Sequence, residues 1–119
     1  MSATSQNYKV ALNANFRIAV QVRDAVTGQV VNITGYSVHM QARPNKDPTS
    51  TPIYLDASVG SGITLTDPVN GRLDLNIPKA TIVALTFSAA YYDIAITDLI
   101  GNVDIILEGI LTTTKGVTA

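Results

Sequence analysis

Hydrophobic and polar side chains alternate along much of the chain, with the period of two that is typical of half-buried β-strands. The longest such stretch, residues 89–114, alternates on both sides of a turn at 98–102. Gly101 and Asn102 in this turn are residue types that tolerate positive φ. We therefore expect a hairpin of two long strands, with a bulge or bend at Gly109, where the alternation is interrupted.

Shorter strands follow from the same period, and turn residues separate them. The loop PNKDPTSTP at 44–52 holds three prolines and no apolar residue. Pro78 can begin a helix, and the spacing of Ile82 and Leu85 predicts one or two helical turns within 79–86. The remaining strands are predicted over 8–12, 16–22, 30–33, 38–42, 53–57, 63–65 and 73–77.

About eight short strands at intervals of roughly ten residues predict an all-β fold. We expect an antiparallel β-sandwich with immunoglobulin-like or related topology and one short helical turn near residues 79–86. A small closed barrel is the alternative. The 119 residues correspond to one domain, so we expect a single β-sandwich domain over 1–119 with loose termini, including a polar start at 1–6.

Charged residues make up only 14% of the chain, against about a quarter in typical soluble domains. Either the surface is filled with Thr, Asn and Ser, or partners in an assembly cover part of it. The net charge of −1 indicates neither a nucleic acid nor an anionic membrane as partner. Residues 1–46 carry five basic side chains and one acidic side chain, whereas residues 47–119 carry three basic and eight acidic side chains. If these halves separate in space, identical copies can pack head to tail.

The sequence holds few residues that carry chemistry. The absence of cysteine excludes disulfides, thiolate metal sites and cysteine nucleophiles. No apolar run reaches the ~18 residues that span a bilayer, and residues 1–10 lack the pattern of a signal peptide. We expect a protein that is not an enzyme and has no cofactor or metal. A small hydrolase using the single histidine, His39, is the weaker alternative, and Asp67 and Asp74 fit hairpin turns better than a calcium site.

Basic and polar residues face outward on two of the predicted strands. Arg17, Gln21 and Arg23 come from the first strand, and His39, Gln41 and Arg43 from the second. If the strands are neighbours, these side chains form a patch that docks an acidic partner or the acidic half of another copy. An ordinary solvated sheet face is the other interpretation.

Tyr91 and Tyr92 point to opposite faces of their strand, so one of them lies outside the core. We expect Tyr91 to be a protein contact. A carbohydrate site would also use an exposed aromatic ring, from Tyr54, Tyr91 or Tyr92.

Several stretches carry a likeness to a known family: F-x-I-x-V-x-V-x-D at 16–24, T-D-P-V-N-G-R-L-D-L-N-I-P at 66–78, Y-Y-D-I-A-I-T-D at 91–98 and L-E-G-x-L-T-T-T at 107–114. Together they resemble small proteins of tailed bacteriophages and prophages that are similar to the N-terminal domain of upper baseplate proteins. The likeness covers residues 15–116. In that family the domain is a β-sandwich that attaches to the tail tip or baseplate and can carry receptor-binding parts.

The resemblance implies a non-enzymatic structural component of a phage virion, assembled in the bacterial cytoplasm. It would be a tail or baseplate adaptor or attachment subunit, repeated in several copies and packed on other virion proteins. The family continues into a long fibre, whereas this sequence ends at Ala119, so we expect the adaptor rather than the receptor-carrying part. A neck or capsid decoration protein and a carbohydrate-binding adhesion module are the alternatives. We expect contacts at 1–8, 44–52 and 115–119.

Overall fold

The computed structural model describes residues 4–115, and these are mostly β-strand. The all-β prediction is confirmed, and so is the helical turn expected within 79–86. None of the helices in the described part is long and apolar enough to cross a membrane. The elements are β1 (Thr4–Ser5), β2 (Tyr8–Ala11), β3 (Phe16–Gln21), β4 (Ser37–Arg43), β5 (Leu55–Val59), β6 (Gly62–Asp67), the 3-10 helix η1 (Pro68–Asn70), β7 (Arg72–Ile77), α1 (Lys79–Ile82), β8 (Ala89–Thr97) and β9 (Val103–Thr114).

The strands form one sheet in the order β1-β9-β8-β4-β5-β6-β7-β3, and β2 also pairs with β9. Most neighbours are antiparallel, but β1 and β2 run parallel to β9, and β5 runs parallel to β6. The prediction of a purely antiparallel arrangement is therefore wrong. Alternation specifies which face of a strand is buried but says nothing about the direction of its neighbour.

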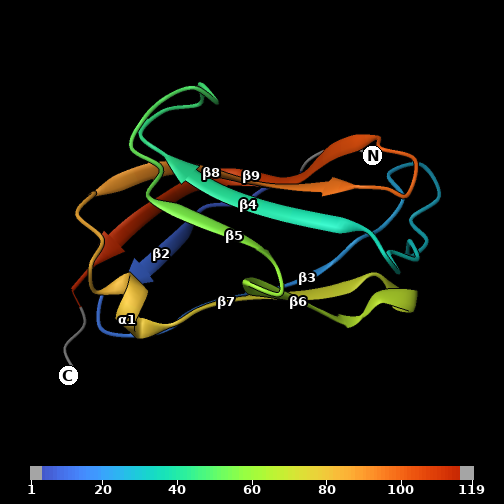
Figure 1. Ribbon diagram of the computed structural model, residues 1–119, viewed down its shortest axis with the longest axis horizontal. Helices are drawn as coiled ribbons and strands as arrows, with labels where there is room; N and C mark the ends of the chain where they lie inside the picture. The colour runs from blue at the N-terminus through green and yellow to red at the C-terminus, as the bar shows by residue number, and fades with distance from the viewer. Residues whose placement is uncertain (1–3, 116–119) are drawn as a thin grey trace.

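The sheet curls into a half-barrel rather than lying flat. In Figure 1, β4, β5, β8 and β9 lie above β3, β6 and β7, and the core fills the space between. The two levels remain joined through β5 and β6, which pair at only two positions, Ser58 with Gly62 and Val59 with Ile63. The described part of the chain is therefore a continuous curled sheet, intermediate between the predicted sandwich and its barrel alternative.

Apolar side chains from both levels meet in a single core. The predicted inward residues of β4, Val38, Met40 and Ala42, are all buried. At one end of the curl, α1 places Ile82 fully into this core. The Asn15 side-chain oxygen accepts a hydrogen bond from the Lys79 backbone N–H at 2.7 Å, which fixes α1 to the turn before β3. Removal of this apolar surface from water is the main source of stability for such a fold.

The N-terminal segment is held against β9. Thr4 and Ser5 pair with Leu107 and Glu108, and the Gln6 N–H donates to the Glu108 carbonyl, so the expected loose start is wrong for residues 4–6. Residues 1–3 and 116–119 lie outside the described part. The expected bulge is also displaced, because the register between β8 and β9 shifts at Ile106 rather than at Gly109. Both residues at this shift, Ile106 and Leu107, are buried.

The predicted strand over 30–33 is wrong. Its backbone bonds to several different segments: the Val31 N–H donates to the Val22 carbonyl and the Ile33 N–H to the Pro68 carbonyl. Only one isolated bridge, Arg23 with Val30, has strand geometry. Ile33 is fully buried and packs into the core from an irregular segment. A short strand can bury its apolar residues in the same way, so the sequence pattern did not distinguish the two.

Candidate functional site

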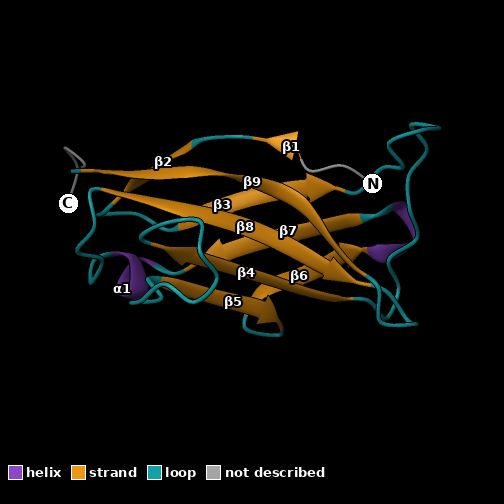
Figure 2. Ribbon diagram, turned by 90° about the horizontal axis from the view of Figure 1, so that it is seen from above, coloured by secondary structure: helices purple, strands orange, loops and turns teal. Residues whose placement is uncertain are grey.

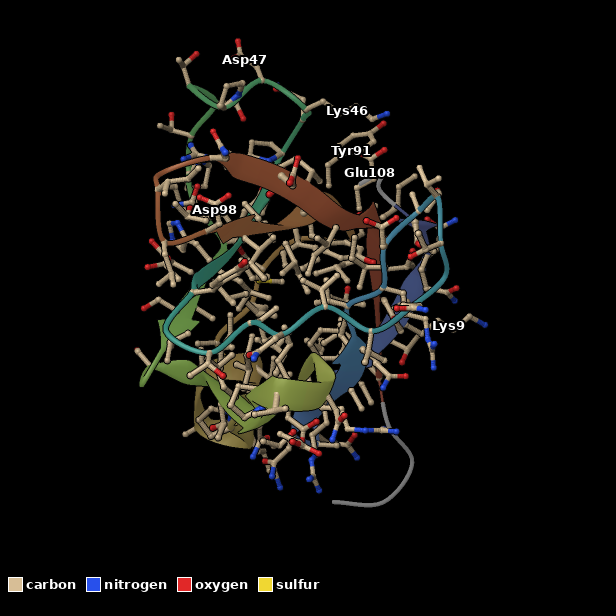
Figure 3. All side chains as sticks on the ribbon, turned by 90° about the vertical axis from the view of Figure 1, so that its right-hand side faces the viewer. Lys9, Lys46, Asp47, Tyr91, Asp98 and Glu108 are labelled. Atoms are coloured by element: carbon tan, nitrogen blue, oxygen red, sulfur yellow. The ribbon has the colours of Figure 1, made fainter. Side chains whose placement is uncertain are left out.

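A groove of about 490 Å³ lies on the outer face of β4, β8 and β9, between the 44–52 loop and the N-terminal segment. It is called the outer groove here. Figure 3 shows Lys46, Tyr91 and Glu108 close together along this side of the molecule, with Asp47 farther out on the loop. The polar and aromatic residues that line it are Ser5, Asn7, Gln41, Arg43, Asn45, Lys46, Tyr91, Tyr92, Asp93 and Glu108.

Strand register builds the floor of the outer groove. Gln41 pairs with Asp56 on one side and with Asp93 on the other, and Asp93 pairs with Glu108. Ser5 continues this row on β1. Because residues in register share a face of the sheet, one row of polar side chains crosses five strands.

Hydrogen bonds tie one side of this row to the 44–52 loop. The Gln41 amide donates to Asp56 at 3.2 Å, and one Arg43 nitrogen donates to the Gln41 side-chain oxygen at 2.9 Å. Another Arg43 nitrogen donates to the Ser50 carbonyl at 2.7 Å. Arg43 therefore links the 44–52 loop to β4 and holds it over the sheet.

His39 and Asp56 form a hydrogen-bonded pair next to this network, with the His39 Nε2 at 2.5 Å from a carboxylate oxygen. Both side chains are about half exposed. The hydrogen bond from His39 lowers the pKa of Asp56, and the Gln41 amide adds to the effect. Ser58 is the cross-strand neighbour of His39, but no hydrogen bond joins its hydroxyl to the ring in residues 4–115.

Asp93 and Glu108 face each other directly across β8 and β9. Partial burial raises the pKa of Asp93, and the Glu108 charge raises it further, while His39 and Arg43 act in the opposite direction. Two like charges in register destabilise a strand pair. The outer groove therefore contains a local accumulation of negative charge beside the basic side chains of Arg43 and Lys46.

Tyr91 forms the aromatic wall of the outer groove and is half-buried, whereas Tyr92 is buried. This agrees with the expectation that the two side chains point to opposite faces of the strand. The Lys46 ammonium lies 5.8 Å from the centre of the Tyr91 ring, within the range of a cation–π interaction. Tyr54 packs on Phe87 instead, with ring centres 4.7 Å apart. Of the three tyrosines considered for a sugar, only Tyr91 lines the outer groove with its ring on the outward face.

The structure separates the predicted basic patch into two parts. His39, Arg43 and Tyr91 lie on the same face, around the outer groove. Arg17 and Arg23 do not join them, because β3 is at the far edge of the sheet and β5, β6 and β7 lie between β3 and β4. The single patch expected from neighbouring strands is therefore wrong. Alternation identified outward residues correctly but did not specify which strands are adjacent.

A second surface was missed by the sequence reasoning. Large apolar side chains are exposed at the end of the molecule made by the segments 22–36, 66–71 and 98–103, called the loop end here. Figure 3 views the molecule from this side, and Asp98 marks the 98–102 turn. Six of the nine exposed large apolar residues in the described part lie here: Val26, Val30, Val69, Leu99, Ile100 and Val103.

Exposure at the loop end is high: 93% for Val26, 73% for Leu99 and 84% for Ile100. Contacts join the segments that carry these residues. The Ile33 N–H bonds to the Pro68 carbonyl, and Gly35 lies against Leu99. The available signal was the Leu99–Ile100 pair within a turn, where polar residues are usual. Grouped apolar exposure of this kind marks contact surfaces.

No group of three or more His, Asp or Glu side chains in residues 4–115 is arranged to hold a metal ion. Comparison of the sequence with protein-family models and with curated proteins finds no match. The outer groove and the loop end are therefore the two candidate sites of this protein.

Proposed function

We propose that this protein is a non-enzymatic structural component of a bacteriophage virion that acts by packing on other proteins. The observation that carries the proposal is the loop end, where Leu99 and Ile100 are more than 70% exposed. Such side chains are costly to leave in water and gain most when a partner covers them. Within a virion, a tail or baseplate adaptor or attachment subunit fits the resemblance described above. A neck or capsid decoration subunit would use the same surface.

The fold supports a role as a rigid building unit. We infer that the two levels of the curled sheet work as a modified β-sandwich of immunoglobulin-like or related topology, joined at β5 and β6. The short pairing at Ser58–Val59 leaves the levels otherwise separate, as in a sandwich. Loops from both levels then meet at the loop end and present one surface.

Composition of purified particles tests the virion proposal. Phage particles released by cells that encode this chain should contain it at a fixed stoichiometry by mass spectrometry. Electron microscopy should then place it at the tail, the neck or the capsid. Particles that lack the chain would contradict the proposal.

The outer groove favours one second candidate, a carbohydrate-binding adhesion module. Tyr91 supplies an aromatic platform, and Gln41 and Asp93 supply hydrogen-bonding groups beside it. A glycan array with the purified chain tests this candidate. Binding that disappears in Tyr91→Ala, with the Tyr54→Ala control unchanged, would favour the adhesion module over the purely structural role.

A further inference from the structure

The two ends of the molecule differ in charge as well as in shape. The end opposite the loop end is formed by residues 8–17, 78–90 and 109–115, and is called the helical end here. Hydrogen bonds join these segments: Lys79 to Asn15, Thr113 to Ser88 and Leu12 to Thr114. Figure 1 shows α1 at the left and the loops at the right, and the molecule measures 41 Å along its longest axis.

All charged side chains in the segments of the helical end are basic. Arg17, Lys79, Lys9 and Lys115 are exposed, and these segments contain no Asp or Glu. The loop end, extended to residues 72 and 104, has the reverse balance, with four acidic residues against two basic ones. The acidic set is Asp24, Asp67, Asp98 and Asp104.

Hydrogen bonds stabilise the ionised carboxylate in two members of the acidic set, Asp24 and Asp98. Backbone hydrogen bonds lower the pKa of Asp98, with Asn102 as the strongest donor. Hydrogen bonds from the backbone of Thr27 and Val26 lower the pKa of Asp24 in the same way. One of the two basic residues, Arg23, is bonded to the Gly28 carbonyl and to Gln21.

Apolar surface accompanies charge on the helical end as well. Val83, at the end of α1, is 59% exposed, and Ala80 and Ala84 beside it are exposed. The helical end therefore combines an apolar area with basic charges only, and the loop end combines a larger apolar area with an excess of acidic charges. Surfaces that match in both respects attract each other and dock in a defined orientation.

We propose that the loop end of one copy of this chain docks on the helical end of a second copy. Leu99 and Ile100 cover Val83 and its neighbours, and Asp98 lies near Lys79. Because two different surfaces meet, the contact is heterologous, and repeated copies form a ring or an open filament. This inference rests on the proposed role as a repeated structural subunit and names the partner of the loop end.

Paired variants of the purified chain test the inference by sedimentation velocity. Wild-type protein should associate with rising concentration, and more weakly at about 0.5 M than at about 0.05 M NaCl because salt screens the exposed charges. Leu99→Asp with Ile100→Asp should weaken association on the order of a hundredfold. Val83→Asp with Lys79→Glu should do the same from the other end. Val59→Asp, on an exposed residue at the β5–β6 turn, is the matched control and should associate like wild type.

Mixing the two defective variants gives the decisive result. Each is expected to be monomeric alone, yet the mixture should form dimers and nothing larger, because one intact loop end meets one intact helical end. Circular dichroism and thermal unfolding of each variant verify that the fold is retained. A loop end that docks on another loop end would leave the helical-end variant associating alone and would overturn the inference.

A wild-type chain that remains monomeric at every concentration would also overturn the inference. It would leave the virion proposal intact if particles contain the chain, because the loop end would then dock on a different virion protein. Absence from particles together with head-to-tail association would contradict the virion proposal alone.

Discussion

The hydroxyl of Tyr92 donates a hydrogen bond to the backbone carbonyl of Gln6, which lies 86 positions earlier in the chain. The ring of Tyr92 is buried and contacts the ring of Tyr8, with centres 6.0 Å apart. Gln6 also donates its N–H to the Glu108 carbonyl at 2.8 Å. The N-terminal segment, which runs parallel to β9 at the edge of the sheet (Figure 2), is therefore fastened beside the outer groove.

Tyr92→Phe removes this hydrogen bond and keeps the buried ring. We expect the free energy of unfolding to fall by roughly 1 kcal/mol, because the Gln6 carbonyl loses a partner at a partly buried position. Urea unfolding measures the change. Tyr91→Phe is the matched control, since its ring is on the outward face, and should shift the free energy by less than about 0.5 kcal/mol. Equal losses in both variants would contradict the fastening role.

The same residue predicts sensitivity to alkaline pH. Burial raises the pKa of Tyr92, and the nearby Tyr8 and Glu108 raise it further. The neutral hydroxyl is thus favoured by folding, so its contribution to stability is complete below a pH of about 10, the usual pKa of tyrosine, and is lost as the pH rises through the folded pKa. Unfolding curves measured from neutral pH to above pH 10 should show this decline. Tyr92→Phe should show a shallower one.

Gly109 is required where the N-terminal segment runs closely alongside β9. A Cβ at this position would collide with the Gln6 carbonyl and lie against the Asn7 side chain. The Asn7 oxygen accepts a hydrogen bond from the Ile110 N–H at 3.0 Å, so the segment cannot move without losing that bond. We expect Gly109→Ala to cost roughly 1–3 kcal/mol and to speed hydrogen exchange at the Gln6 amide. Thr112→Ala, on the exposed face of the same strand, should change neither quantity appreciably.

The importance of Gly109 illustrates what the sequence can and cannot predict. Its interruption of the alternation was visible, and a bulge was the natural interpretation. The reason lies instead in the parallel approach of residues 4–7, which is a contact between opposite ends of the chain. Local patterns carry no information on such long-range approaches, which is why the register shift at Ile106 was also unexpected.

Short sequence patterns predicted the structure correctly where it depends on residues that are close together in the chain. The hairpin of β6 and β7 turns at Asn70 and Gly71 as predicted, with Gly71 in the left-handed region at φ 72°. Gly71 has a second constraint that was not visible, because a Cβ there would lie 2.7 Å from the Val22 and Val31 carbonyl oxygens. The irregular 22–36 segment crosses at this point. Its apolar residues were assigned to a strand because burial alone does not distinguish the two.

The residues of the candidate site were also predictable individually, whereas their grouping in space was not. His39, Arg43 and Tyr91 were identified as outward residues, and they lie around the outer groove. The grouping with Arg17 was wrong because strand order is a property of the whole sheet. The loop end was missed because its segments are far apart in sequence and come together only in the fold, where Gly35 lies against Leu99 and Ile33 bonds to Pro68. The uneven distribution of charge was visible in the sequence. In the structure, however, the basic and acidic side chains separate between the two ends of the molecule and not between the two halves of the chain.

The facing carboxylates of Asp93 and Glu108 give the last prediction. Burial and the Glu108 charge raise the pKa of Asp93, so folding favours its neutral form and the ionised form destabilises the fold. The penalty is absent below the usual pKa of about 4 and grows as the pH rises above it. Asp93→Asn should therefore increase the free energy of unfolding by roughly 0.5–1 kcal/mol at pH 7 and by much less at pH 3.

A double-mutant cycle with Glu108→Gln attributes this gain to the carboxylate pair. The two substitutions should not add at pH 7, because either one removes the repulsion. Additive effects would show that Asp93 is destabilised by burial alone. A loss of stability in Asp93→Asn at pH 7 would show that Arg43 and His39 outweigh Glu108, and that the outer groove is electrostatically balanced as it stands.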